Sequence, residues 1–445
     1  MRYLPHTRQD INQMLAVTGH ADLDQLFETI PDSAKTKTGL NLPDSLSEWE
    51  LNTTMEELAS RNAACRSYTC LMGAGSYDHH IPAIVPQLTS RSEFMTAYTP
   101  YQPEVSQGTL QGIYEFQTMV TRLLGMDIAT ASHYDGGTAL AECALIALRK
   151  SKNTTKIAVS TLIHPSHRHI IKTYIGPSGY EMVDIPADQN GLTDLAAFKS
   201  MDGIAGVAVQ SPNFLGNIED LGNFKTVADE KDCIFITSFT EAMAYGLLKS
   251  PGHFGADLVA GEGQSLGIAK SFGGPGLGLL AGTQKMMRNL PGRFVGKTVD
   301  TNGRRGYVLT LATREQHIRR EKASSNICSN NGLNAMTAAI YMAAAGKNGI
   351  REIARLNHDK AVYLKNKLEG AGFKPVYSSA FFNEFVMKAP AGFAERRREI
   401  AEKHNMFAGV CLESYYPEMA DHYLFCATET VSRQAMDLLA KEVQS

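Results

Sequence analysis

The sequence predicts an α/β protein in which a large domain with a mostly parallel sheet precedes a small C-terminal α+β domain. The first observation is a series of short, continuous apolar segments that alternate with helical segments between residues 138 and 260. Such segments are typical of parallel strands covered on both faces, joined by right-handed crossovers. The second is an ordinary globular composition, with 43% hydrophobic and 20% charged residues. A chain of 445 residues is long enough for a large domain and a smaller companion.

Residues 1–60 predict an N-terminal helical arm. Thr7 and Asp10 form the pattern of a capping box, and Ile11, Met14 and Leu15 follow on one helical face. A short arm of this kind cannot bury its apolar stripe by itself. It packs either on a neighbouring subunit or on the body of its own chain, and the sequence leaves both alternatives open.

Residues 61–345 predict the large α/β domain. A long helix at about 109–124, which ends at Gly125, buries an apolar face. The predicted strands that follow are 156–160, 181–185, 206–209, 233–237 and 257–260. The predicted helices that accompany them are 138–151, 165–174, 222–230, 241–248 and 333–345.

Residues 346–445 predict the small α+β domain. Its helices are expected at 350–369, 392–404 and 431–443. Its strands are expected near 373–377, 382–388 and 423–428. The sequence shows no internal repeat, low-complexity tract or charge block that would indicate another architecture.

Charge and cysteine usage exclude several classes of protein. The net charge of −3 and the pI of about 6.5 provide no basic field for nucleic acid or anionic lipid. Seven cysteines without a C-x-x-C pair indicate reduced thiols. The N-terminus has no apolar core of signal-peptide length, and no apolar run approaches the length of a membrane helix. We therefore expect a soluble cytoplasmic chain. No set of His, Cys and carboxylate residues has the spacing of metal ligands, so no metal is expected.

The stretch from Met95 to Gly108 is the most distinctive local feature. Pro100 and Pro103 fix their own φ angles and push the preceding residues towards extended conformations. The stretch is therefore expected to be a stiff loop that displays aromatic and polar side chains in fixed directions, as a substrate pocket or partner surface requires. Local chemistry alone leaves a rigid surface connector as the alternative.

Several other segments accompany this loop in a fixed order. They are 73–82, 135–142, 263–267, 272–276, 290–296, 313–328 and 415–418. Together with residues 95–108, they resemble the glycine decarboxylase P-protein family. The resemblance implies the aspartate-aminotransferase-like fold of pyridoxal phosphate (PLP) enzymes of fold type I. The length of 445 residues resembles the alpha subunit of the two-subunit form, because a fused form would need a second half of similar size.

The resemblance implies an assembled enzyme that decarboxylates glycine on pyridoxal phosphate and passes the aminomethyl group to the lipoyl group of H-protein. The expected partners are an obligate beta subunit, in an α2β2 heterotetramer, and H-protein. Such chemistry needs a lysine that binds the cofactor. Counting back from Gly273, the position of that lysine is occupied by Gln264, and an amide cannot form an imine. The cofactor is therefore expected on the beta subunit, with none bound covalently by this chain.

Two further parts of a cofactor site are degenerate in the sequence. Gly136, Gly137 and Thr138 open a helix whose free N–H groups would suit a phosphate. Asp135 beside them would repel a phosphate, and an ordinary helix start capped by Asp135 is the alternative interpretation. Glu241 is the nearest carboxylate to the position where catalytic members place an aspartate under the pyridine nitrogen.

We expect this chain to complete the active site of the beta subunit. The residues expected to reach that site are Tyr98, Tyr101, Gln102, Glu104, Ser106 and Gln107 of the loop, joined by Tyr77, Asp78 and His79. Phenol and carboxamide groups could hold the glycine carboxylate and the cofactor edge by hydrogen bonds.

A dense basic cluster lies near residue 317. It consists of Arg314, His317, Arg319 and Arg320. The cluster would suit a carboxylate or the acidic surface of H-protein. The alternative is an interdomain helix whose arginines pair with Glu315 and Glu321.

Two other functions stay open at the level of sequence. The chain could be a stand-alone pyridoxal phosphate enzyme that uses Lys270, three residues before the glycine run at Gly273. It could also be a non-catalytic scaffold or regulatory subunit. Substitution of Lys270 tests the first alternative, and substitutions in the loop test the second.

Overall fold

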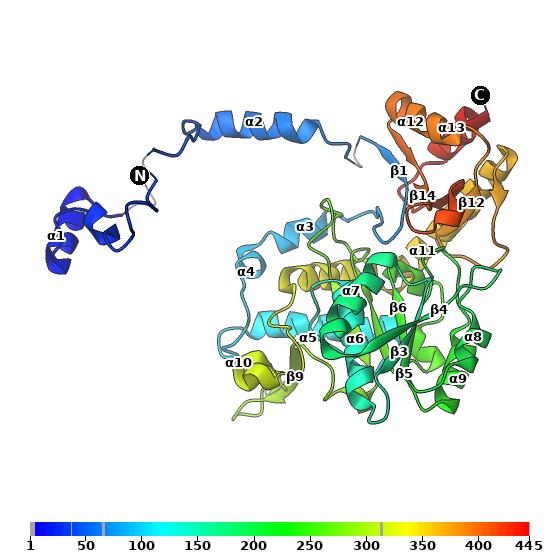
Figure 1. Cartoon of the computed structure of the whole chain (residues 1–445), viewed down its shortest axis with the longest axis horizontal. Helices are drawn as coiled ribbons and strands as arrows, with labels where there is room; N and C mark the ends of the chain where they lie inside the picture. The colour runs from blue at the N-terminus through cyan, green and yellow to red at the C-terminus, as the bar shows by residue number, and fades with distance from the viewer. Residues whose placement is uncertain (1–4, 37, 65–66, 312–314, 445) are drawn as a thin grey trace. The chain divides into compact units, whose positions relative to one another are not determined.

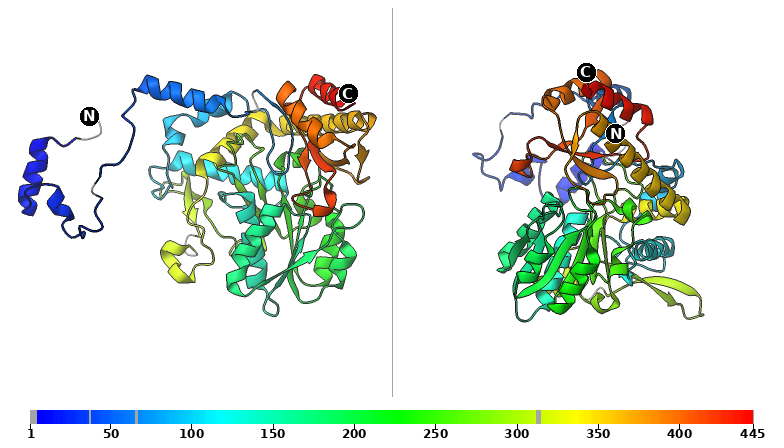
Figure 2. Two further views of the ribbon diagram at one scale, coloured as in Figure 1. Left: turned by 45° about the horizontal axis from the view of Figure 1, so that its top comes forward. Right: turned by 90° about the vertical axis from the view of Figure 1, so that its right-hand side faces the viewer.

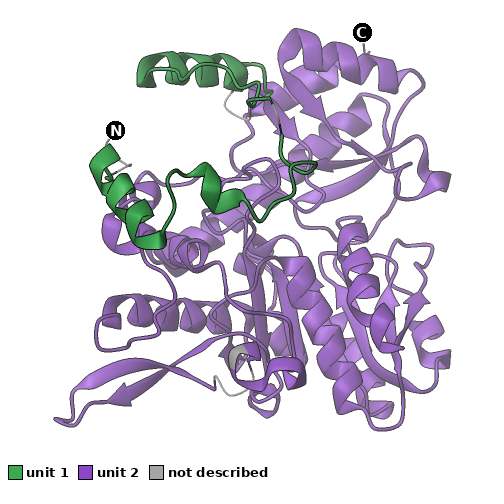
Figure 3. Ribbon diagram, turned by 60° about the vertical axis from the view of Figure 1, so that its left-hand side comes forward, with its two compact units in different colours: residues 1–63 green, residues 64–445 purple. Residues whose placement is uncertain are grey.

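The computed structural model describes residues 5–36, 38–64, 67–311 and 315–444. Internal contacts divide the chain into two compact units, residues 1–63 and residues 64–445 (Figure 3). The first unit contains α1 (Arg8–Thr18), the 3-10 helix η1 (Asp24–Phe27) and α2 (Glu48–Ser60). Both α-helices begin with a complete capping box, Thr7 with Asp10 and Ser47 with Glu50, so the predicted helix start at Thr7 is confirmed.

The second unit is built on a seven-stranded sheet with the order β2-β8-β7-β6-β5-β3-β4. Its strands are β2 (Ile128–Ala129), β3 (Lys156–Ser160), β4 (Glu181–Ile185), β5 (Ile204–Gln210), β6 (Ile234–Phe239), β7 (Leu258–Glu262) and β8 (Gly278–Gly282). Figure 1 labels β3, β4, β5 and β6 of this sheet. β3 to β7 run parallel to one another. At one edge β8 pairs antiparallel with β7, and β2 pairs antiparallel with β8. The predicted mostly parallel sheet is therefore confirmed.

Helices cover both faces of this sheet (Figure 2). One face packs against α6 (Gly136–Lys150) and α7 (Pro165–Ile175). The other packs against α5 (Gln107–Leu124), α8 (Leu195–Ser200), α9 (Leu221–Glu230) and the first half of α11 (Gly332–Gly370). Burial from both sides explains why the sequence of the central strand β5 is almost continuously apolar.

A second, antiparallel sheet lies in the C-terminal part of this unit. Its order is β11-β12-β15-β14, with β11 (Lys374–Pro375), β12 (Glu384–Lys388), β15 (His422–Cys426) and β14 (Val410–Cys411). Its core includes residues of the second half of α11, α12 (Phe393–His404) and α13 (Arg433–Gln444). A short strand near the start of the unit, β1 (Thr69–Leu71), pairs with β13 (Met406–Ala408) in the same region. The segment after the arm thus joins the C-terminal region, although the sequence grouped it with the large domain.

The two helices expected at 333–345 and 350–369 are confirmed as the two halves of α11, which join at the non-helical Gly346. Other elements differ from their predicted form. The helix expected at 241–248 is the 3-10 helix η3 (Ala242–Gly246). The glycine-bounded strand β8 and the hairpin of β9 (Phe294–Val299) and β10 (Arg305–Thr310) were not predicted. Glycine has a low propensity for β-strands, so the sequence of β8 favours the prediction of a loop.

Candidate functional site

The carboxyl ends of the parallel strands meet at one edge of the central sheet, where α/β proteins of this kind bind ligands. β6 ends just before Glu241, and β7 leads through Glu262 to Gln264. The amino end of α6 reaches the same edge, because a Cβ atom on Gly136 would lie only 2.6 Å from the backbone nitrogen of Glu262. Folding therefore brings together Gln264, Glu241 and the glycines that the sequence singled out.

A segment from outside the sheet, Gly73–His80, lies on this edge. The Tyr77 N–H donates to Oε1 of Gln264 at 2.9 Å, and Nε2 of Gln264 donates to the carbonyl of Ile268 at 2.7 Å. The imidazole Nε2 of His164 donates to the carbonyl of Ala74 at 3.0 Å. Both ends of the Gln264 amide are occupied, so this side chain ties the segment to the sheet edge.

The side chain of Tyr77 points into the protein and is 1% exposed. Its hydroxyl donates to Oε2 of Glu384 at 2.8 Å and lies 3.0 Å from the hydroxyl of Thr240. The Ala74 N–H donates to the other carboxylate oxygen of Glu384 at 2.6 Å. Burial raises the pKa of Glu384 to about 7 and raises the pKa of Tyr77 well above its usual value.

His79 lies between two carboxylates. Its Nε2 is 3.0 Å from Glu241 and its Nδ1 is 2.9 Å from Glu429. Burial alone would lower the pKa of His79, but the two carboxylates outweigh burial and raise it to about 10. The imidazole is therefore a buried cation that joins the segment to the start of η3 and to the loop after β15.

These positions correct one expectation. Tyr77 and His79 were expected to reach the site of a partner, but their side chains are buried inside their own chain and hold it together. Asp78, between them, is fixed by its carbonyl, which accepts a hydrogen bond from Thr428 at 2.5 Å. The partners that bury Tyr77 and His79 lie more than 160 positions away in the sequence, so local sequence alone does not reveal their inward direction.

Two N–H groups at the amino end of α6, those of Gly136 and Thr138, already have carboxylate acceptors. Oε2 of Glu262 accepts from Gly136 at 2.9 Å, and Oδ1 of Asp135 accepts from Thr138 at 2.7 Å. The other oxygen of Glu262 accepts from Leu277 at 2.8 Å and from Gln264 at 3.1 Å. Burial raises the pKa of Glu262 to about 7.

The residues at this edge do not fit pyridoxal phosphate. A phosphate at the amino end of α6 would have to replace Glu262 and lie beside Asp135, so negative charges would repel. Gln264 cannot form an imine, and its amide is already hydrogen-bonded to Tyr77 and Ile268. Tyr77, Gln264, Glu262 and Glu384 are thus engaged by groups of their own chain.

The loop that the sequence predicted to be stiff is exposed, in contrast to the buried edge of the sheet. Residues 97–102 contain no helix or strand, and Tyr98 is 82% exposed and Tyr101 59% exposed. Gln102 and Glu104 are also exposed, whereas Ser106 is half-buried just before α5. The loop therefore presents two phenols, an amide and a carboxylate on the surface of this unit.

Gln107, at the first turn of α5, anchors one end of the loop. Its amide nitrogen donates to the carbonyls of Pro103 at 2.7 Å and Tyr307 at 2.9 Å, and its oxygen accepts from the Tyr307 N–H at 2.9 Å. Gln107 was expected to reach a partner's site, but its polar atoms are used to fix the loop to β10. Gln107 therefore supports the conformation of the loop.

Arg293, just before β9, anchors the other end of the loop. Nη1 donates to the hydroxyls of Thr99 at 2.7 Å and Ser329 at 3.0 Å. Nη2 donates to the hydroxyl of Tyr101 and to the carbonyl of Cys328, both at 3.0 Å. The sequence analysis did not assign a role to Arg293, and its only signal was its place in the segment 290–296.

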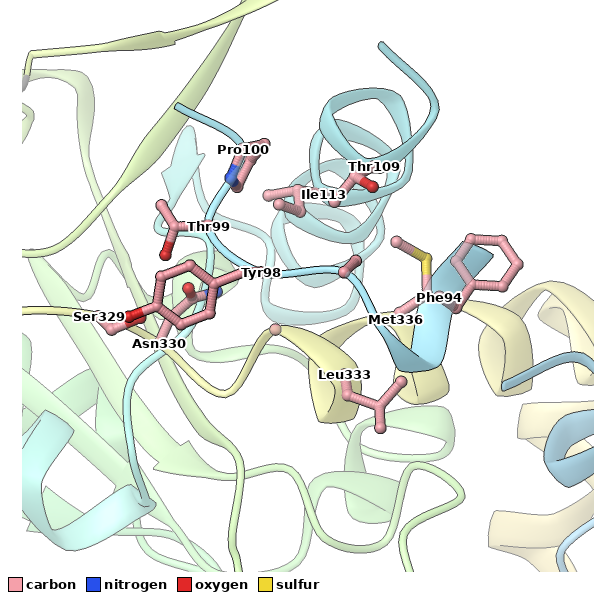
Figure 4. Close-up of a pocket in the computed structure, with 12 residues that line it drawn as sticks. Phe94, Tyr98, Thr99, Pro100, Thr109, Ile113, Ser329, Asn330, Leu333 and Met336 are labelled. Carbon is pink, nitrogen blue, oxygen red and sulfur yellow. The ribbon is translucent and has the colours of Figure 1, made fainter. Parts of the chain in front are cut away.

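A small pocket of about 120 Å³ lies beside the anchored loop (Figure 4). Tyr98, Thr99 and Pro100 line it from the loop, and Ile113 lines it from α5. Ser329 and the start of α11 complete the wall. The pocket shows that the loop packs over a real depression and does not merely cross a flat surface.

The remaining predicted residues lie elsewhere. Arg314 and the side chain of His317 lie outside the described residues, and Arg319 and Arg320 are exposed at the end of α10 (Gln316–Arg319). The ammonium of Lys270 lies 3.8 Å from the sulfur of Cys70 in β1, whereas Glu262 and Asp135 occupy the amino end of α6. Among the residues that the structure describes, every helix is too short or too polar to cross a membrane.

Comparison with known proteins gives consistent results. Residues 1–443 match the family model described as "Glycine cleavage system P-protein". The "Probable glycine dehydrogenase (decarboxylating) subunit 1" of Desulfotalea psychrophila is 50% identical over 100% of this chain and 98% of that protein. The protein of the same name from Anoxybacillus flavithermus is 46% identical over 99% of this chain and 98% of its own length.

Solved structures agree with the sequence relatives. A crystal structure of glycine decarboxylase (P-protein) of the glycine cleavage system, in inhibitor-bound form, has a TM-score of 0.91 and 40% identity, covering 100% of this chain and 99% of that one. Aspartate aminotransferase from Thermus thermophilus has a TM-score of 0.58 at 13% identity, covering 84% of this chain and 98% of that one. The second likeness shows the fold alone, and it confirms the predicted aspartate-aminotransferase-like fold class.

Proposed function

Because the chain belongs to the glycine cleavage system P-protein family, we propose that it is the glycine decarboxylase subunit that completes the catalytic site without carrying the cofactor. The relatives are named subunit 1, which implies a second subunit. We assign the pyridoxal phosphate to that beta subunit. Within the assembly, pyridoxal phosphate supplies the electron sink that decarboxylation of glycine requires.

One contrast carries the proposal. The edge of the sheet that would bind a cofactor is filled by side chains of this chain. Glu262 accepts a hydrogen bond from the amino end of α6, and Gln264 accepts one from the Tyr77 N–H. The loop at Tyr98–Glu104 is exposed and anchored at both ends by Arg293 and Gln107. A surface loop held in one geometry suits a site that another subunit supplies.

The exposed loop residues have the chemistry to handle glycine. The hydroxyls of Tyr98 and Tyr101 and the amide of Gln102 can donate hydrogen bonds to a carboxylate. Glu104 can accept from an ammonium group or a cofactor hydroxyl. We propose that these four residues line the beta subunit's site, with Ser106 behind them, and that they orient glycine and exclude water.

The wider assembly follows from the same proposal. The enzyme passes the aminomethyl group to the lipoyl group of H-protein and releases CO2, and the subunits form an α2β2 heterotetramer. We propose that Arg319 and Arg320, which are exposed, contact an acidic surface of H-protein. The cytoplasmic location expected from the sequence stays a prediction.

Reconstitution tests the proposal. The chain and its beta subunit are expressed separately and together, and exchange of labelled CO2 into glycine is measured with H-protein present. We expect exchange only in the mixture, and we expect the near-visible absorption of the cofactor to follow the beta subunit. Exchange by this chain alone, lost on Lys270→Ala, would instead establish a stand-alone enzyme.

Loop variants separate a completing subunit from a scaffold. Glu104→Gln removes a charge from an exposed side chain. We expect it to form the complex normally and to lower the exchange rate about tenfold, since one oriented catalytic contact is typically worth that factor or more. Full activity of both Glu104→Gln and Tyr98→Phe would favour a scaffold.

A further inference from the structure

A buried cation lies directly beneath the exposed loop. Arg293 is 5% exposed and follows the turn at Pro291–Gly292 into β9. Its backbone carbonyl accepts a hydrogen bond from Ala131 at 2.8 Å, so its main chain is fixed to the body of the unit. The guanidinium is thus presented to the loop from a rigid base.

Among the described residues, the hydrogen-bond partners of the guanidinium are all neutral. Its four hydrogen bonds go to the hydroxyls of Thr99, Tyr101 and Ser329 and to one backbone carbonyl. Within the described ranges, no carboxylate oxygen lies within 4.0 Å of Arg293, whereas other buried cations such as His79 are paired. Burial of a charge without a counterion is costly and uncommon.

The contacts of Arg293 join two segments that are far apart in sequence. Thr99 and Tyr101 belong to the loop, whereas Cys328 and Ser329 precede α11. The second segment is itself held by Tyr134, whose hydroxyl accepts from the N–H groups of Cys328 at 3.2 Å and Ser329 at 3.4 Å. Arg293 therefore fixes the loop against a segment that has its own support.

The geometry at Tyr101 assigns a direction to its proton. The phenol oxygen accepts a hydrogen bond from Nη2 of Arg293 at 3.0 Å, and the guanidinium carbon lies 5.3 Å from the centre of the ring. A phenol that accepts on one side keeps its own O–H to donate elsewhere. The cation behind the oxygen polarises that O–H and strengthens its bond to an anionic acceptor.

We propose that Arg293 is a positioning residue that holds Tyr101 so that its hydroxyl donates to the carboxylate of a small amino acid substrate. This inference rests on the proposed function, because the substrate lies in the site of the beta subunit. Arg293 itself does not touch the substrate. It acts by fixing Thr99 and Tyr101 and by its positive charge, which also favours binding of a carboxylate.

The test uses the reconstituted complex and measures KM for glycine and kcat separately. The variants are Arg293→Lys, Tyr101→Phe and the double variant, and the matched control is Arg355→Lys. Arg355 is an exposed arginine whose guanidinium pairs with Glu352 and Asp359 of its own helix. Lysine keeps the charge but cannot make the four divergent hydrogen bonds of the guanidinium.

We expect Tyr101→Phe and Arg293→Lys each to raise KM for glycine about tenfold, with unchanged complex formation and an unchanged KM in the control. Adding Arg293→Lys to Tyr101→Phe should raise KM less than about twofold further, because both changes remove the same interaction. If Arg293→Lys assembles poorly, Thr99→Val, which removes one anchor of the loop and leaves Arg293 intact, should raise KM about threefold.

The outcomes separate the two claims. A raised KM in Tyr101→Phe together with an unchanged KM in Arg293→Lys and Thr99→Val would overturn the role of Arg293 and leave the proposed function standing. Independent, multiplicative effects of the two substitutions would also overturn it. An unchanged KM in Tyr101→Phe, with Tyr98→Phe and Glu104→Gln also fully active, would overturn both this inference and the proposed function.

Discussion

Tyr77 and Tyr98 lie 21 positions apart in the sequence and have opposite fates in the fold. Tyr77 is 1% exposed and its hydroxyl donates a hydrogen bond to Glu384, whereas Tyr98 is 82% exposed on an anchored loop. The sheet edge around Tyr77 and the loop around Tyr98 both gather polar and aromatic side chains. At the edge Tyr77, Gln264 and Glu262 are engaged by their own chain, whereas at the loop Tyr98, Gln102 and Glu104 are exposed. Satisfied hydrogen bonding, more than residue type, therefore distinguishes a closed site from an open one.

The largest effect is expected at the closed edge. His79→Ala leaves Glu241 and Glu429 buried without their shared cation, and removal of one partner of a buried charge pair costs about 3–5 kcal/mol. We expect a marked fall in the midpoint of thermal or urea unfolding. His80→Ala is the matched control, because the adjacent His80 side chain is exposed. Equal stability of the two variants would show that the edge does not depend on its ion pairs.

A second pair of variants tests the same comparison by substituting the exposed Tyr98 of the loop and the buried Tyr77 of the sheet edge. Tyr98→Ala removes an exposed phenol, so we expect the unfolding midpoint to change little and kcat/KM of the reconstituted complex to fall by about tenfold or more. The same substitution at Tyr77 should do the reverse and destabilise the isolated chain, because it removes the hydroxyl that donates to Oε2 of the buried Glu384. Loss of stability in Tyr98→Ala would contradict the distinction.

The pH dependence of stability sharpens the description of the closed edge. The pKa of His79 is raised to about 10 from 6.5. Its protonation therefore contributes fully to the free energy of unfolding below about pH 6.5, and this contribution is lost as the pH rises towards 10. Glu262 and Glu384, with pKa values raised to about 7, also bind protons more tightly in the folded chain, and their contribution is lost between about pH 4.5 and 7.

The thermal midpoint should therefore fall between pH 7 and 10, and His79→Gln should flatten this part of the profile. The measurement is a series of melting curves for both proteins at constant ionic strength. A midpoint of the unsubstituted chain that rises over this range would show that His79 is not held as a cation.

The smallest expected effect concerns the missing lysine. Gln264→Lys restores the residue type that binds pyridoxal phosphate, but Glu262 still occupies the amino end of α6 and segment 73–80 still covers the edge. We expect the isolated variant to show no new near-visible absorption band when pyridoxal phosphate is added. A band that appears in Gln264→Lys and not in Gln264→Glu would mean that the edge opens readily.

The sequence predicted the elements of the fold well where local rules decide them. Continuous apolar runs placed β3 and β4 with their observed bounds, and the capping pattern at Thr7 placed the start of α1. The glycine-rich β8 was missed because its strand is stabilised by its neighbours β7 and β2. The sequence also located Gln264 and the exposed loop, through their resemblance to a family.

The inward-facing contacts could not be predicted in the same way. The bond between Tyr77 and Gln264 joins residues 187 positions apart, and the bond between Tyr101 and Arg293 spans 192 positions. Neither is visible to propensity or periodicity, which act over a few turns. This is why Tyr77, His79 and Gln107 were expected to face a partner, and why Arg293 was given no role.

The central claim is that this chain's own sheet edge is closed and that its loop serves the site of the beta subunit. The most direct test is the number of pyridoxal phosphate molecules bound per pair of subunits in the active, reconstituted complex. The account predicts one, bound by the beta subunit and retained in Gln264→Ala. Two molecules per pair, or one that dissociates when Gln264 or Glu262 is substituted, would contradict it.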